Sequence, residues 1–169
     1  MDTPVASSPG CEVALADVPS VLFSEQFLLR APRGIEFVDE NPVFAVSAPN
    51  PGPTTCALRL RRVMAMVFEH DPAKSLPLFA NDFIATLAQQ GYAGGQPLHT
   101  HHDDPGDLRL SLWFPSHADN PAVELYLAFA VRDDLVVAVV YELDEGTLDS
   151  LLPTLETSAR SLLRVPPEA

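Results

Sequence analysis

The sequence contains little cysteine, little positive charge and no long apolar run. Its two cysteines, Cys11 and Cys56, lie far apart and outside any paired motif, so they give neither a disulfide framework nor a zinc site. No apolar segment reaches the ~18 residues that a membrane span needs. The first ten residues lack a basic segment followed by an apolar core, so no signal peptide is predicted. We therefore expect a cytoplasmic protein.

The shortage of positive charge restricts the partners. There are 10 lysines and arginines against 23 aspartates and glutamates, which gives a net charge of −13. Nucleic acids and anionic membrane surfaces both need a concentrated positive face, so we expect neither as a partner. The charge suits a protein partner with basic or apolar surface, although acidic residues also serve solubility alone. The sequence leaves open whether the chain forms a homodimer.

Motifs of catalysis and cofactor binding are also missing. No serine lies in a nucleophile elbow, and Gly94 and Gly95 do not belong to a phosphate-binding loop. No catalytic residue and no cofactor are predicted.

The 169 residues are expected to form one domain. Residues 1–20, rich in proline, serine and alanine, are predicted to be a flexible N-terminal tail, and residues 21–169 a single α+β domain. Alternating or continuous apolar segments predict strands. These segments are 21–29, 35–38, 43–46, 56–68, 98–102, 108–114, 122–131 and 135–143.

Two details of the strands are expected from the pattern. The apolar phase of 56–68 breaks at Arg61 and Arg62, and a β-bulge there would restore it. Residues 135–141 are apolar at every position, which is typical of a central strand that is covered on both sides.

Two helices are predicted. Ser75 caps the first, over 75–90, with Pro77 in its first turn, Phe79 and Phe83 on its core face, and Gly91 as its stop. The second runs from about residue 147 to 163 with a leucine-rich stripe. The predicted fold is a twisted antiparallel sheet of about six strands packed with two main helices, which together cover one dry face of the sheet.

Three segments carry a resemblance: the helix 75–90, the hairpin strands of 126–143, and the tail 146–156 with its leucine-rich helix. This order resembles the PsbP-like fold over about residues 35–164. That superfamily includes photosystem subunits, a Ran-binding nuclear import factor, DcrB-type bacterial proteins and chaperones of type VI secretion effectors. The resemblance implies a binding module rather than an enzyme. The proline-rich entry and a histidine hairpin depart from it.

The histidine hairpin is the candidate metal site. On an extended strand, His99 and His101 share one face with Cα atoms about 6–7 Å apart, so their imidazoles could share Zn²⁺ or Ni²⁺. Oxygen ligands would come from Asp103 or Asp107, and His117 could approach from the next loop. The alternative is a set of surface histidines beside an acidic turn.

Two further groups are candidates for partner binding. Arg59 and Arg61 form a small basic patch that could take a carboxylate or phosphate, or could simply protect an edge strand. Trp113 and Tyr126 lie on adjacent strands, on the face opposite the leucines. They form an exposed aromatic patch if that face is open, and core if a helix covers it.

The sequence favours a non-enzymatic protein-binding module, such as a chaperone or adaptor, that holds a protein segment on a sheet face or in an edge groove. The alternative is a small metal-dependent enzyme centred on the hairpin of His99, His101 and His102.

Overall fold

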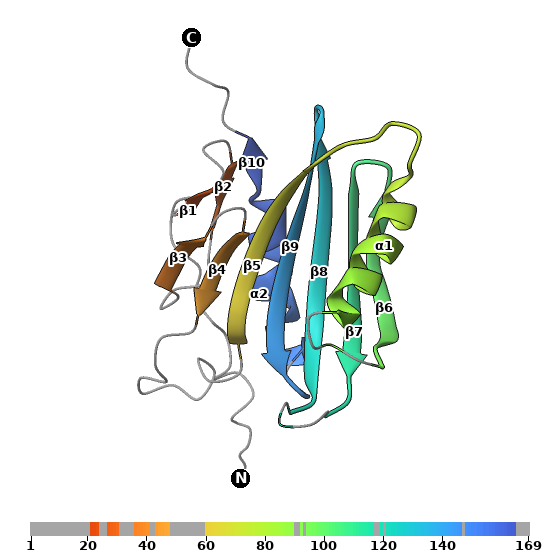
Figure 1. Cartoon of the computed structure of the whole chain (residues 1–169). Helices are drawn as coiled ribbons and strands as arrows, with labels where there is room; N and C mark the ends of the chain where they lie inside the picture. Colours follow the sequence, from red (N-terminus) through yellow and green to blue (C-terminus); the bar gives the residue numbers. More distant parts are fainter. Residues whose placement is uncertain are drawn as a thin grey trace.

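The computed structural model describes residues 21–23, 27–30, 36–40, 43–47, 60–89, 92, 94–116, 119, 121–146 and 148–164. These residues form strands and two helices in an α+β arrangement (Figure 1). In chain order the elements are β1 (Val21–Phe23), β2 (Phe27–Leu29), β3 (Glu36–Glu40), β4 (Val43–Ser47), β5 (Leu60–Glu69), α1 (Leu76–Ala88), β6 (Gln96–Asp104), β7 (Asp107–Phe114), β8 (Val123–Arg132), β9 (Leu135–Asp144), α2 (Leu148–Arg160) and β10 (Leu163–Arg164).

The predicted fold class is confirmed. A seven-stranded antiparallel sheet has the order β3-β4-β5-β9-β8-β7-β6, so it has one strand more than the expected number of about six. A small sheet, β1-β2-β10, lies beside it. The predicted strand 21–29 is in fact two strands, β1 and β2, which pair antiparallel with Val21 opposite Leu29.

The predicted bulge in β5 is also confirmed. Leu60 pairs with Leu143 of β9 and Arg62 pairs with the neighbouring Glu142, so Arg61 is the extra residue. After this shift Val63 and Ala65 face one side of the sheet and Met64 and Met66 the other, which gives both sides apolar contacts.

The two helices cover opposite faces of the sheet, so the expectation that both cover one dry face is wrong (Figure 1). Leu87 of α1 packs with Leu125 and Leu127 of β8, whereas Leu151 of α2 packs on the face that carries Tyr126. The physical reason lies in β9, which is buried along its length on both faces, as predicted. A strand that is apolar on both faces needs a covering layer on each side.

Local signals set the start of α1. The Ser75 side chain accepts a hydrogen bond from the Leu78 backbone N–H at 3.4 Å, and Pro77 stands in the first turn. The predicted stop at Gly91 lies outside the described residues.

The second helix ends at Arg160, earlier than predicted, and the chain then pairs with β2 through Leu163 and Leu28. Two partly buried hydrogen bonds fix this junction. The Arg30 backbone N–H donates to Ser161 Oγ at 2.8 Å, and Ser158 Oγ donates to the Arg30 carbonyl at 2.7 Å. The backbone of β2 and of Arg30, the residue after it, thus gives the end of α2 a partner that a periodic pattern does not reveal.

Some predictions fall outside the described residues, among them the tail at 1–20 and the first four residues, 56–59, of the predicted strand 56–68. Within the described part of the chain, neither helix is long and apolar enough to cross a membrane.

Candidate binding groove

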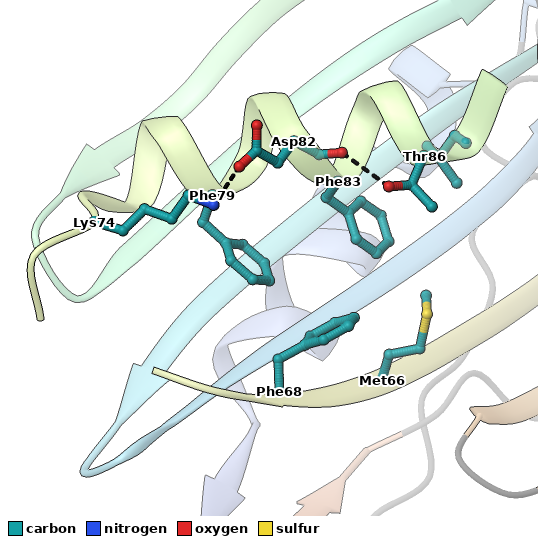
Figure 2. A pocket seen from close by; sticks show the side chains of 8 residues that line it. Met66, Phe68, Lys74, Phe79, Asp82, Phe83 and Thr86 are labelled. Carbon is teal, nitrogen blue, oxygen red and sulfur yellow. Dashed lines mark hydrogen bonds and ion pairs between the residues drawn. The ribbon is translucent and has the colours of Figure 1, made fainter. Parts of the chain in front are cut away.

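A groove runs along the flank of α1 that faces β5. The helix contacts β7 and β8, so it lies toward one side of the sheet and leaves space next to β5. The space has a volume of about 250 Å³. Figure 2 shows Met66 and Phe68 of β5 facing Phe79 and Phe83 of α1 across it. We call this space the α1 groove; its other lining residues are Lys74, Asp82, Thr86 and Leu87.

An aromatic cluster builds the floor of the α1 groove. The Phe68 ring meets the Phe79 ring edge to face, with centroids 5.3 Å apart. Phe83 meets the Phe129 ring of β8 in the same manner at 5.4 Å. Edge-to-face contacts of this kind hold rings in fixed positions and add roughly 0.5–1.5 kcal/mol beyond burial. The floor is therefore a rigid apolar surface, with the flexible Met66 at one end.

Two more hollows continue the α1 groove toward the β6–β7 hairpin. The first, of about 310 Å³, shares Phe68, Lys74 and Phe79 with it and reaches His70. The second, of about 510 Å³, adjoins the first at His70 and extends to Asp103 and Asp104. Together they form a continuous path from the apolar floor to an acidic end.

The charges along this path are mostly negative. The positive charge along the path comes from Lys74. The carboxylates that line it are those of Glu69, Asp71, Asp82, Asp103 and Asp104. Lys74 pairs with the Asp82 carboxylate at the mouth of the α1 groove (Figure 2). The Thr86 hydroxyl donates to the Asp82 carbonyl at 3.0 Å, so it is used within the helix. The path thus combines an apolar floor with an acidic rim.

Sequence reasoning assigned Phe79 and Phe83 to the core and did not find the groove. Both rings do pack in the core cluster on the α1 side, but Phe79 also keeps part of its surface open. Helical spacing predicts which residues face the sheet. It does not say how far the helix lies from β5, and that distance is what opens the groove.

The structure does not bring the predicted metal ligands together. His99 and His101 are neighbours, with ring centroids 5.9 Å apart. His101, however, is an extra residue in β6, since Thr100 pairs with Leu110 and His102 with Arg109. This bulge reverses the side-chain alternation, so Asp103 lies on the α1 side of the sheet while His101 packs against Tyr126 on the α2 side.

The remaining candidates do not complete a metal site. His102 Nε2 lies 2.6 Å from Asp104 Oδ2, and Asp107 pairs with Arg132 at 3.1 Å. His117 lies outside the described residues. Across the described ranges, no group of three or more histidine, cysteine, aspartate and glutamate side chains is placed to hold a metal ion.

His101 belongs to a polar cluster under α2. Its Nε2 lies 3.0 Å from the buried Ser111 hydroxyl, and burial lowers the pKa of its imidazole below the ordinary value, against the opposing effect of Glu156. Arg109 is also buried there; its Nε lies 3.8 Å from Glu156 Oε2, and this nitrogen has no hydrogen-bond partner within the described structure. Sequence reasoning missed this cluster because arginine normally marks a solvated face.

Tyr126 and Trp113 do not form an exposed aromatic patch. Tyr126 is instead a core residue covered by a helix, which was the alternative prediction for this face. The Tyr126 side chain is 0% exposed beneath α2, its hydroxyl donates to Glu156 at 3.2 Å, and burial raises its pKa. Trp113 is half-buried and donates from Nε1 to Glu145 at 2.7 Å. Arg59 lies outside the described residues, as does the side chain of Arg61 in β5.

Comparison with known proteins adds information on the fold. No protein-family model matches the sequence. No curated protein matches it either. Among solved structures, cyanobacterial PsbP (CyanoP) from Synechocystis is similar with a TM-score of 0.52 at 14% identity, over 82% of this chain and 86% of that chain. The fold is PsbP-like.

Two other structures are similar to this PsbP-like chain. A Bacteroides thetaiotaomicron protein has a TM-score of 0.50 at 9% identity and covers 83% of this chain, which spans only 45% of that protein. A Pseudomonas aeruginosa protein of unknown function has a TM-score of 0.49 at 14% identity, over 92% of this chain and 99% of that chain. At these identities the likeness describes the fold and nothing further.

Proposed function

We propose that the protein is a non-enzymatic binding module, a chaperone or adaptor, that holds a segment of a partner protein in the α1 groove. The single observation that carries the proposal is the apolar floor of Phe68, Phe79 and Met66, open to solvent beside an ordered helix. Grooves between a helix and a sheet are places where apolar side chains of a partner segment can bind.

The size and charge of the path favour a protein segment over a small molecule. The three adjoining hollows, of about 250, 310 and 510 Å³, form an elongated path that is open to solvent, whereas a small ligand is usually enclosed in a single cavity. The acidic rim, which ends at Asp103 and Asp104, is complementary to basic residues. A segment with an apolar face and basic flanks satisfies both features.

A direct test uses a labelled synthetic peptide of leucine and lysine with an apolar face of helical period, measured by fluorescence anisotropy. The comparison peptide has the same composition in an order that breaks the apolar face, so the charge is equal. We expect the amphipathic peptide to bind more tightly.

Two substitutions in the groove are expected to weaken that binding on the order of tenfold, equivalent to about 1.4 kcal/mol. Met66→Gln makes the floor polar, and Thr86→Gln fills the mouth from an exposed helical position. Leu78→Ala is the matched control, because Leu78 is 54% exposed on the same helix and does not line the groove. Equal binding of both peptides, or equal loss in all three variants, would exclude the α1 groove as the site.

A further inference from the structure

Lys74 lies where the α1 groove meets the two adjoining hollows. Its side chain lines all three adjoining hollows, and its ammonium group pairs with Asp82. In Figure 2 the Lys74 chain extends beside Phe79 to reach that carboxylate. An apolar stem beside an aromatic ring and a cation on an acid is the arrangement that a basic residue of a partner would adopt here.

We propose that Lys74 fills the place of a partner's basic side chain, and that a partner's arginine or lysine replaces it on Asp82 when the segment binds. This inference rests on the proposed function and adds the chemistry of the partner. The segment carries a basic residue next to its apolar anchor, and Asp82 is the residue that selects it.

Displacement of Lys74 from Asp82 costs little free energy. The side chains of Lys74 and Asp82 are 40% and 65% exposed, and ion pairs exposed to this degree contribute little to stability. Arginine forms a stronger, two-pronged contact with a carboxylate than lysine does. Once it is displaced, Lys74 remains close to other acids. Its backbone N–H donates to the Asp71 carbonyl at 2.9 Å, and Glu69 and Asp71 line the adjacent hollow.

The test compares variants at both ends of the pair. Lys74→Gln removes the competing cation and is expected to tighten binding of the leucine–lysine peptide by up to about fivefold, whereas Asp82→Asn is expected to weaken it by a similar factor. Arg160→Gln and Asp119→Asn are the matched controls, because they make the same charge changes at exposed positions away from the α1 groove. A second peptide, with glutamine in place of lysine, keeps the apolar face without the charge.

The outcomes separate the two proposals. Tighter binding to Lys74→Gln and weaker binding to Asp82→Asn, seen for the lysine peptide and absent for the glutamine peptide and the controls, would support the exchange. If both peptides bind through Met66 and Thr86 while the Lys74 and Asp82 variants match their controls, the exchange is overturned and the proposed function stands. If neither peptide binds, both are overturned.

Discussion

Replacement of Ser158 should reveal how α2 is attached to the sheet. Ser158 is 0% exposed, and its hydroxyl has one proton, which it donates to the Arg30 carbonyl at 2.7 Å. The Tyr141 hydroxyl, 2.8 Å away, must therefore be the donor in the second hydrogen bond. This chain of bonds joins β9, α2 and the segment after β2.

Ser158→Ala removes the oxygen that accepts the Tyr141 proton and leaves that hydroxyl buried. An unsatisfied buried hydroxyl costs roughly 1–3 kcal/mol, which for a chain of this length lowers Tm by about 2–4 °C per kcal/mol. Urea and thermal unfolding, followed by circular dichroism, measure the loss. Thr157→Ala is the matched control, because the Thr157 hydroxyl bonds only to the Pro153 carbonyl of its own helix in an exposed position.

A double-mutant cycle with Tyr141→Phe makes the test strict. Removal of both hydroxyls leaves no orphaned group between them, so the double variant should be more stable than the sum of the single losses implies, by about 1 kcal/mol. Strict additivity, or a loss in Ser158→Ala no larger than in Thr157→Ala, would refute the reasoning.

Three other outcomes follow from the structure. Burial lowers the pKa of His101 below 6.5, so the unfolded chain binds more protons. The stabilising contribution of neutral His101 should therefore be fully present above pH 6.5, and the free energy of unfolding should decrease as the pH falls below that value in pH-dependent denaturation. His101→Asn should reduce this pH dependence, and an unchanged profile would contradict the assignment. Phe129→Ala, at a ring 1% exposed, should cost about 3–5 kcal/mol, whereas an equal loss from Leu78→Ala would discredit the packing argument. Zn²⁺ added to chelator-treated protein should leave Tm unchanged, because His99 and His101 have no third ligand among the described residues; a rise would restore the metal hypothesis.

The sequence predicted those features of the fold that periodicity and local chemistry determine. Strand 135–143 is apolar at nearly every position, and it is the central strand β9. The cap at Ser75 and the bulge at Arg61 also follow from local signals, a hydroxyl before a helix and a break in alternation.

Other features depend on contacts distant in the chain. The second helix ends at Arg160 because Ser158 and Ser161 bond to the backbone at Arg30, more than a hundred residues earlier. The metal hypothesis assumed regular alternation from His99 to Asp103, and the bulge at His101 removes it. No pattern in residues 99–103 marks that bulge, since its cause is the register of β6 on β7.

The α1 groove follows from the proportions of the fold. The five strands from β5 to β6 span about 19 Å at about 4.8 Å per spacing, and a helix with its side chains is about 10–12 Å wide. One helix on this face therefore covers part of that width, and α1 contacts β7 and β8. The strip beside β5 is left to large side chains, and Phe68 and Met66 supply them from the strand itself. Shortening them should thus widen the groove at the expense of the core, so its depth and the stability of this face are set by the same residues.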